Sequence, residues 1–255
     1  MSVDRSPIRI ALLSDVHANL HALDAVLAHI AARGDIDARY HLGDLVGYSA
    51  YPNEVVARLA EEGVAGVSGN YDTTVAHGYK HCGCRSENPE QEALAHISFE
   101  WTCRTVTTET KRALASLPFR LDLRPLGGHL AGPTLVLMHA TPSSNLVYVT
   151  EDRSDDFLRR MATQAGARPG DVLAFGHTHK PWTRTVGEVL FVNTGSVGRP
   201  KDGDPRAAYV VLDFSAHEPC ATIERVPYDV MAAKAALEDG GLPGAFGLVL
   251  ESGLA

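Results

Sequence analysis

The chain contains little cysteine, with four residues (Cys82, Cys84, Cys103 and Cys220) among 255. So few cysteines are not expected to form a disulfide framework, which favours a cytoplasmic, reducing location. No run of about 18 apolar residues occurs, so neither a membrane-spanning helix nor a membrane partner is expected. The segment Met1 to Arg9 mixes acidic and basic residues without a long apolar stretch, so a signal peptide is not expected.

Positive charge is also scarce. The net charge is −8, with 21% charged and 45% hydrophobic residues. An acidic chain offers no broad electrostatic grip on DNA or RNA, so we expect no extended nucleic-acid surface. A small phosphorylated substrate stays compatible, because bound metal ions would reverse the charge locally. The length suits a single domain over residues 1–255, and a homo-oligomer is compatible with it.

The first 70 residues alternate between short apolar runs and helical patterns. Asn19 can cap a helix that ends at Gly34, and Pro52 suits the first turn of a second helix that runs to Glu62. This alternation predicts right-handed crossovers and a parallel sheet. The predicted strands are Arg9 to Ser14, Tyr40 to Leu42 and Val64 to Ser68.

Residues 73–117 predict a helical insertion over one end of the sheet, with helices from Pro89 to about Thr105 and after Thr107 or Thr108. One further helix is expected at about Asp155 to Ala165, and residues 228–255 form a tail that looks helical at its start and is Gly-rich at its end. The predicted later strands are Phe119 to Leu123, Thr134 to Met138, Asp171 to Phe175, Val189 to Val192, Ala207 to Phe214 and Ala221 to Val226.

Polar residues follow five of the predicted strands at their carboxyl ends. In open α/β sheets ligands bind at that edge. Carboxylate, imidazole and amide oxygen suit Mn²⁺, Fe or Zn²⁺, and the absence of thiolate argues against a structural zinc site. Two such ions would lower the pKa of a bridging water and neutralise phosphate oxygens. The candidate ligands are Asp15, His17, Asp44, Asn70, His139, His177 and His179.

These residues stand in motifs that resemble those of the calcineurin-like metallophosphoesterases. The gaps agree, with 25 residues between His17 and Gly43 and 24 between Asp44 and Gly69. Residues 15–23, 193–200 and 202–209 resemble the small bacterial and archaeal phosphodiesterase-like branch, and the resemblance covers about residues 8–227. The motifs are Asp15-Val16-His17, Gly43-Asp44, Gly69-Asn70-Tyr71-Asp72, His139 and Gly176-His177-Thr178-His179.

The resemblance implies an α/β fold, a four-layer α/β/β/α sandwich of two mixed sheets with flanking helices. It also implies two divalent ions bridged by Asp44, with Mn²⁺ favoured over Fe, Zn²⁺, Ni²⁺ or Mg²⁺. The implied ligands of the first ion are Asp15, His17, Asp44 and His179. Those of the second are Asp44, Asn70, His139 and His177.

One position departs from the wider family, in which a histidine that assists the transition state or the leaving oxygen follows the asparagine. Here that position is Tyr71. A phenol with a pKa near 10 is a poor general acid at neutral pH, although it can donate a hydrogen bond. We therefore expect a bias towards good leaving groups or diesters. Asp44, Asn70 and Tyr71 are the candidate catalytic residues.

Other residues are weaker candidates. Asn145 and Tyr148 follow His139 in a predicted loop and could contact substrate, and Arg199 could pair with a phosphate. Asp72 is interpreted as a turn residue rather than a ligand. A group formed by His77, His81, Cys82 and Cys84 could hold a third metal or act as a redox switch, but a simple turn is favoured.

The sequence thus predicts a dinuclear metal-dependent phosphoesterase in which a metal-bridging hydroxide attacks phosphorus, with phosphodiesters or nucleotides as favoured substrates. Alternatives are a phosphomonoesterase, a protein phosphatase-like enzyme and a dinucleoside polyphosphate hydrolase. A non-catalytic metal-binding scaffold is a remote alternative, because relatives that became scaffolds lose metal ligands and this chain has lost none.

Overall fold

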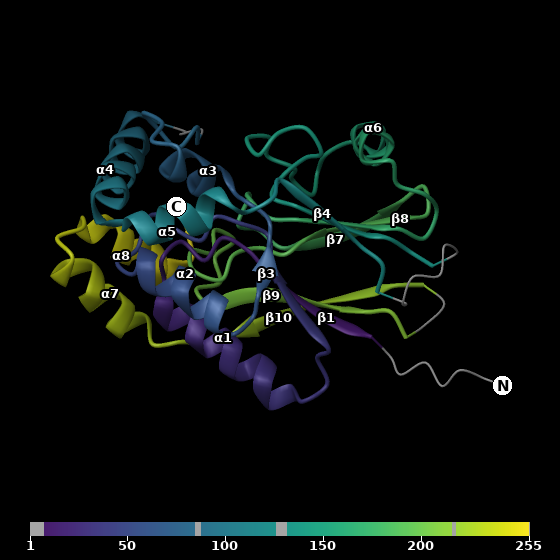
Figure 1. Cartoon of the computed structure of the whole chain (residues 1–255), viewed down its shortest axis with the longest axis horizontal. Coiled ribbons are helices and arrows are strands. Elements are labelled where there is room, and N and C mark those ends of the chain that lie inside the picture. Colours follow the sequence, from purple (N-terminus) through teal and green to yellow (C-terminus); the bar gives the residue numbers. More distant parts are fainter. Residues whose placement is uncertain (1–7, 85–87, 126–131, 216–217, 255) are drawn as a thin grey trace.

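The structure is a computed structural model that describes residues 8–84, 88–125, 132–215 and 218–254. Two five-stranded sheets lie face to face (Figure 1). The order in sheet A is β10 (Cys220–Val226), β9 (Ala207–Asp213), β1 (Arg9–Leu13), β2 (Ala38–His41) and β3 (Ala65–Gly66). The order in sheet B is β4 (Arg120–Leu123), β5 (Leu135–Met138), β6 (Val172–Phe175), β8 (Val189–Asn193) and β7 (Trp182–Val186).

Both sheets are mixed. In sheet A, β1, β2 and β3 are parallel, as predicted, whereas β9 and β10 are antiparallel. In sheet B, β5, β6 and β8 are parallel and the edge strands β4 and β7 are antiparallel. The carboxyl ends of the parallel strands of each sheet therefore lie at one edge.

Helices flank the two sheets. Helix α1 packs on sheet A together with α2, and α6 lies on the outer face of sheet B (Figure 1). The remaining helices gather at the end of the molecule beyond the strand ends. The helices are α1 (Leu20–Arg33), α2 (Pro52–Glu61), α3 (Asn70–Ala76), α4 (Pro89–Thr105), α5 (Thr108–Ala115), α6 (Asp155–Ala165), α7 (Val230–Asp239) and α8 (Gly244–Ser252).

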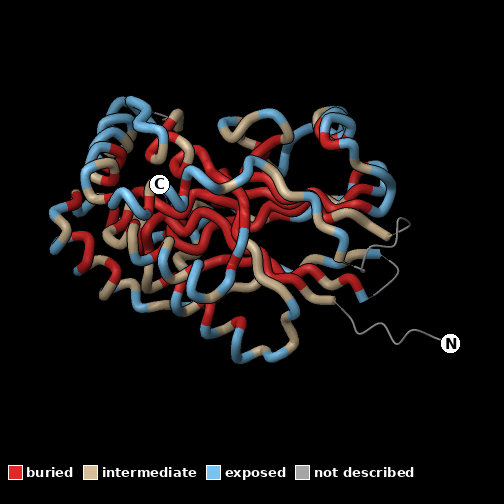
Figure 2. Tube along the Cα trace, in the orientation of Figure 1, coloured by how far each residue is buried: buried red, intermediate tan, exposed pale blue. Residues whose placement is uncertain are grey.

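Alternating side chains of the strands build three hydrophobic layers (Figure 2). In β1, Ala11 and Leu13 face the helices, whereas Ile10 and Leu12 face sheet B, because successive side chains of a strand point to opposite faces. The layer between the sheets also contains Leu135 and Leu137 of β5, and a third layer joins sheet B to α6. Three apolar layers between four layers of structure confirm the α/β/β/α sandwich.

Local signals explain many boundaries. Asn19 caps α1 by accepting a hydrogen bond from the backbone of Ala22, and Gly34 ends the helix with a φ of 67°. Pro52 begins α2, as predicted. Helix α3 and strand β7 were not predicted, and β3 is shorter than predicted. The described part of the C-terminal tail expected over residues 228–255 contains two helices, α7 and α8. No helix among the described residues is long and apolar enough to cross a membrane.

His41, at the end of β2, makes the stability of the fold depend on pH. Burial lowers the pKa of His41 to about 4, and its Nδ1 has no hydrogen-bond partner. An unfolded histidine titrates near pH 6.5, so the unfolded state binds a proton that the folded state refuses. The contribution of His41 to the free energy of unfolding is therefore fully present above about pH 6.5. It is lost as the pH falls towards 4, and the loss is about 2 kcal/mol at pH 5.

We predict that His41→Gln, which does not titrate, reduces the loss of unfolding free energy between pH 7.5 and pH 5 by about 2 kcal/mol. Urea unfolding of both proteins at the two pH values measures this difference, in which the other histidines cancel. An equal loss in both proteins would contradict the assignment.

Candidate metal centre

The predicted ligands meet at the carboxyl ends of strands from both sheets. Asp15 and His17 follow β1 and Asp44 follows β2 in sheet A; His139 follows β5 in sheet B. His177 and His179 follow β6. Two groups of three could each hold an ion, with ligand atoms within 4.8 Å of one another in each group. The first triad is Asp15, His17 and His179; the second triad is Asp44, His139 and His177.

The first triad presents unprotonated nitrogens to one another. His17 Nε2 lies 3.1 Å from His179 Nε2, and His179 Nε2 lies 3.3 Å from Asp15 Oδ1. The Nδ1 atoms donate to backbone carbonyls, from His17 to Val46 at 3.0 Å and from His179 to Arg199 at 2.6 Å. In a neutral imidazole whose Nδ1 carries the proton, Nε2 is an acceptor. Three acceptor atoms thus face one another with no hydrogen between them.

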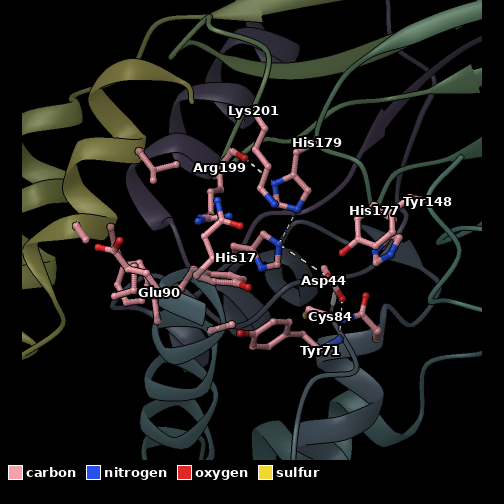
Figure 3. Close-up of a pocket in the computed structure, with 18 of the residues that line it drawn as sticks. His17, Asp44, Tyr71, Cys84, Glu90, Tyr148, His177, His179, Arg199 and Lys201 are labelled. Atoms are coloured by element: carbon pink, nitrogen blue, oxygen red, sulfur yellow. Dashed lines mark hydrogen bonds and ion pairs between the residues drawn. The ribbon is translucent and has the colours of Figure 1, made fainter. Parts of the chain in front are cut away.

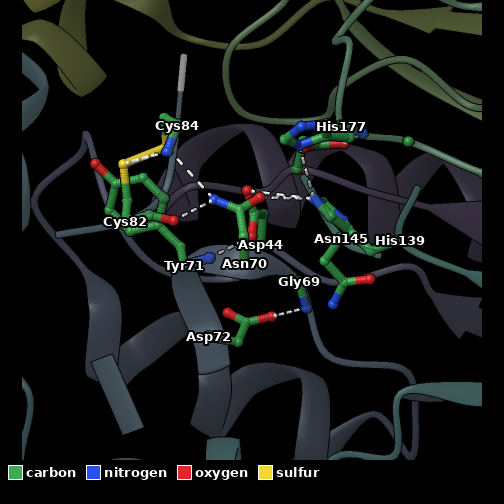
Figure 4. Close-up of polar contacts among 12 residues, drawn as sticks. Asp44, Gly69, Asn70, Tyr71, Asp72, Cys82, Cys84, His139, Asn145 and His177 are labelled. Carbon is green, nitrogen blue, oxygen red and sulfur yellow. Dashed lines mark hydrogen bonds and ion pairs between the residues drawn. A yellow bond between two sulfur atoms is a disulfide. The ribbon is translucent and has the colours of Figure 1, made fainter. Parts of the chain in front are cut away.

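The second triad repeats this arrangement around His139. Its Nδ1 donates to the carbonyl of Leu42 at 2.8 Å, which leaves Nε2 as an acceptor. That Nε2 lies 3.1 Å from Asn70 Oδ1, 3.1 Å from His177 Nδ1 and 3.5 Å from Asp44 Oδ2 (Figure 4). Asn70 therefore joins this triad through its amide oxygen, as the sequence predicted for a ligand.

A short cysteine segment orients Asn70. Asn70 Nδ2 donates to the carbonyl of Cys82 at 3.1 Å and lies 3.4 Å from Cys84 Sγ, so its oxygen must point towards His139 (Figure 4). Cys82 and Cys84 are joined by a disulfide. A bond between these cysteines agrees with the redox-switch alternative, although the sequence analysis favoured a simple turn. The third metal considered for these cysteines and their neighbouring histidines does not form among the described residues, because neither candidate metal group contains any of them.

Asp44 lies between the triads. Its Oδ2 is 3.5 Å from His139 Nε2 and 3.8 Å from His17 Nε2, and its Oδ1 accepts from the backbone of Tyr71 at 2.8 Å. One oxygen thus reaches the nitrogens of both triads. This is the geometry that a bridging carboxylate needs.

Buried acceptors without donors fit divalent cations. Asp15 Oδ1 is buried and has no hydrogen-bond partner, and Asp15 itself is fully buried. Unpaired lone pairs at this depth are costly unless a cation lies between them. Imidazole, carboxylate and amide donors without thiolate suit first-row divalent metals.

The electrostatics agree with this fit. Burial, together with the charges of Asp15 and Asp72, raises the pKa of Asp44 to about 8 against the opposing effect of His139. Burial also acts to raise the pKa of Asp15, but nearby imidazoles, His179 first among them, outweigh it and lower that pKa. Burial lowers the pKa of His179 to about 4. Burial acts to lower the pKa of His139, but the charges of Asp44 and Asp15 outweigh it and raise that pKa. Asp44 and His139 therefore compete for one proton, and an ion bound between neutral imidazoles and carboxylates would take its place.

The backbone is strained at the ligands. Five of the six triad residues have left-handed backbone angles, which cost a non-glycine residue roughly 1–2 kcal/mol each. Gly69 is needed because a Cβ there would collide with the carboxylate of Asp44. Strain concentrated at one site indicates function. The φ values are 51° for Asp15, 48° for His17, 52° for Asp44, 67° for His177 and 61° for His179.

Known proteins resemble this chain over most of its length. The family model of the calcineurin-like phosphoesterase superfamily domain matches residues 8–217. The chain belongs to this superfamily. An uncharacterized protein of Methanocaldococcus jannaschii is 31% identical over 251 residues, which span 92% of this chain and 93% of that protein.

Two named relatives add an activity. The phosphodiesterase YfcE of Escherichia coli is 27% identical over 218 residues, 81% of this chain and 88% of that enzyme. A metallophosphoesterase structure from Sphaerobacter thermophilus has a TM-score of 0.75 and 26% identity, covering 97% of this chain and 100% of that one. This calcineurin-like phosphoesterase is therefore a metal-dependent hydrolase of phosphate esters.

Around the metal centre of this phosphoesterase lie the predicted substrate residues. Asn145 Nδ2 donates to the carbonyl of Ser68 at 2.8 Å, and its buried Oδ1 has no partner. The ring of Tyr148 lies 4.2 Å from that of His177, centroid to centroid. Asp72 accepts from the backbones of Gly69 and Leu45, which agrees with the predicted turn role. Asn145 and Tyr148 stay predictions as substrate contacts.

Tyr71 is close to the centre but its hydroxyl is turned away from it. That hydroxyl lies 3.2 Å from Ser98 Oγ on α4, and the ring of Tyr71 packs edge-on against His17. Burial raises the pKa of Tyr71 well above 10. The structure therefore gives Tyr71 a packing contact with a ligand, and its catalytic role stays a prediction.

Arg199 is the cation best placed for an anionic substrate. It is 9% exposed, its guanidinium lies 4.2 Å above the ring of Tyr48, and its Nε has no hydrogen-bond partner. Among the described residues it forms no ion pair, which is unusual for a buried charge. Arg199 lines a cavity over the metal ligands, and Lys201 lies at the same cavity (Figure 3). Tyr48 lines it as well. Tyr48 and Lys201 were missed by the sequence analysis, since neither belongs to a recognised motif.

We predict that Mn²⁺ at about 100 times its dissociation constant raises the melting temperature of metal-stripped protein by roughly 5–10 °C. Asp44→Asn should lose most of this shift, because its carboxylate oxygen serves both triads. The matched control is Asp156→Asn, whose side chain is 79% exposed. Equal shifts in the two variants, measured by differential scanning calorimetry, would remove Asp44 from the site.

Proposed function

We propose that this enzyme uses two divalent ions, one in each triad, to hydrolyse phosphodiesters or nucleotides. The observation that carries the proposal is the pair of buried triads with Asp44 between them. When bound, such ions lower the pKa of a shared water and neutralise the phosphate oxygens. The chain itself holds its histidines in the ligand tautomer through the carbonyls of Val46, Arg199 and Leu42.

Two positively charged side chains near the triads are placed to contact the substrate phosphate. Arg199 supplies a buried guanidinium with planar donors that match phosphate oxygens. Stacking on Tyr48 fixes the plane of the guanidinium before substrate arrives. Lys201, at the same cavity, adds a second positive charge. We infer that these two residues orient the phosphate while the triads carry the reacting centre.

The side chains that could protonate the leaving oxygen bear on which substrates are favoured, and they support a bias towards good leaving groups. Every histidine among the described residues lining the cavity is a proposed metal ligand, and the hydroxyl of Tyr71 contacts Ser98 instead of the cavity centre. A leaving oxygen therefore finds no histidine at the cavity other than the proposed ligands to act as its general acid. Diesters with acidic leaving groups depend least on such an acid, so we rank them above phosphomonoesters, phosphoproteins and dinucleoside polyphosphates.

Three finer assignments belong to this proposal. Manganese is favoured as the native metal because the ligands are nitrogen and oxygen atoms without thiolate. A cytoplasmic location rests on the sparse cysteines, and a homo-oligomer is compatible with the chain. The alternative of a metal-binding scaffold is disfavoured by the full set of ligands and the buried cation at the cavity.

The first test is hydrolysis of bis(p-nitrophenyl) phosphate and p-nitrophenyl phosphate by metal-stripped protein to which Mn²⁺, Zn²⁺ or Mg²⁺ is returned. We predict metal-dependent turnover with the diester preferred. Asp44→Asn should lower the rate at least about 100-fold with an unchanged circular dichroism spectrum, whereas Asp156→Asn should keep it. Full activity of Asp44→Asn would refute the two-ion proposal.

Arg199→Gln should lower kcat/KM by about 100-fold, because one preorganised donor set to the phosphate is lost. Metal content should not change, since only the backbone carbonyl of Arg199, which the substitution keeps, contacts a ligand. Arg206→Gln, at an exposed surface pair with Asp204, is the matched control. A loss of bound metal in Arg199→Gln, determined by elemental analysis, would instead show that the residue supports the ligands.

A further inference from the structure

The cavity above the metal ligands has a second, apolar half. The whole cavity has a volume of about 290 Å³ and extends from His17 and Asp44 to a wall on the opposite side. The wall consists of Leu94 and Ala95 of α4 and Ala245, Phe246 and Val249 of α8. None of these residues belongs to the metal-binding motifs. Figure 3 shows the cavity with the ligands on one side and Glu90 of α4 on the other.

This wall is held in place by its own small core. Phe246 packs in a cluster with Leu237 and Leu250. Trp101 of α4 donates its indole N–H to the carbonyl of Gly240 at 2.8 Å, which ties α4 to the turn before α8. Trp101 is partly buried against this cluster and its N–H is satisfied, so it anchors α4 against α8 and holds the wall in position.

Aromatic contacts link the wall to the phosphate-binding cation. The ring of Phe246 meets Tyr48 edge-on at 5.8 Å between centroids, and Tyr48 carries the guanidinium of Arg199 on its face. A ligand whose phosphate lies at Arg199 and the metals must therefore place its organic part along this wall. An apolar wall opposite polar groups is typical of a small-molecule site.

Size and charge narrow the ligand. A cavity near the lower limit of small-molecule sites suits one compact ring rather than a polymer. Glu90, in the first turn of α4, places an exposed carboxylate at the rim. A second anionic phosphate on the organic arm would approach this carboxylate and be repelled, whereas an uncharged ring with an N–H group would not.

We propose that α4 and α8 form a subsite for the organic arm of the phosphoester. The subsite takes one flat, uncharged ring, of the size of a single aryl group or nucleobase, and Glu90 disfavours arms that carry another phosphate. This specificity rests on the proposed function, because the arm is defined by a phosphate bound at the metal centre.

Hydrolysis-resistant phosphonates test the subsite without any turnover. Calorimetric titration of the Mn²⁺-loaded whole chain compares methylphosphonate with phenylphosphonate and with an adenine ring joined to phosphonate by a short ether linker. At least one ring-bearing ligand should bind about tenfold more tightly than methylphosphonate. The ring that gains identifies an aryl or a nucleobase arm, and no gain with either ring overturns the proposal.

Variants of one helix locate the gain. Val249→Trp fills the cavity and should abolish the tenfold advantage of the ring while methylphosphonate binds as before. Leu248→Trp is the control, since the neighbouring Leu248 is 62% exposed and does not line the cavity. An advantage that survives Val249→Trp places the ring elsewhere. If the metal-loaded protein hydrolysed neither aryl phosphate ester but still bound a ring-bearing phosphonate more tightly than methylphosphonate, the proposed reaction would be refuted and the subsite would stand.

The charge rule has a separate test. Glu90→Gln should tighten the binding of 1,4-phenylenebisphosphonate by about fivefold and leave phenylphosphonate unchanged, because only the former carries a second anionic group on the far side of its ring. Glu92→Gln, in the same turn of α4 but outside this cavity, is the matched control. Equal affinities in the two variants would remove Glu90 from the specificity of the subsite.

Discussion

The structure depends on one unfavourable arrangement, in which buried acceptor atoms point at one another. Nitrogens of His17 and His179 lie 3.1 Å apart, and each is an acceptor because the other nitrogen of the ring donates to a carbonyl. Such a cluster is stable only around cations. The carbonyls that fix the tautomers, the strained backbone and the depth of the site all serve to keep these lone pairs directed inwards.

The two sheets share the task of bringing these atoms together. Asp15 and Asp44 come from sheet A, whereas His139, His177 and His179 come from sheet B. Each triad therefore spans the layer between the sheets, and the packing of β1 against β5 and β6 sets the spacing of the ligands. Because that layer is closely packed and apolar, a change of volume there should be felt at the metal centre.

Most strands could be predicted from the sequence, because buried strands of the parallel type are continuous apolar runs that end in Asp or His. The packing of two sheets was implied by the family resemblance. The structure brings six of the seven predicted ligands into two triads, and their role as ligands stays a prediction. The bounds of helix α8 within the expected helical tail could not be predicted, since Gly244 and Gly247 disfavour a helix in isolation and the packing of Phe246 stabilises it. Strand β7 was signalled by its alternating residues and by the turn at Gly187 and Glu188, but this signal was overlooked.

The substrate side of the centre illustrates what local patterns cannot supply. Tyr48, Arg199 and Phe246 come from distant parts of the chain, and their stack exists only after the helices dock on the sheets. The disulfide beside Asn70 likewise depends on the conformation of a short turn. Tyr71, which the motif comparison set apart from the wider family, is fully buried between the metal ligands and α4.

The most direct test of the account is anomalous diffraction at the manganese edge from crystals grown with Mn²⁺. The account predicts two separate peaks, one bounded by Asp15, His17 and His179 and the other by Asn70, His139 and His177, with Asp44 between them. A single peak, or peaks away from these residues, would contradict the central claim that the facing acceptors form a dinuclear metal centre.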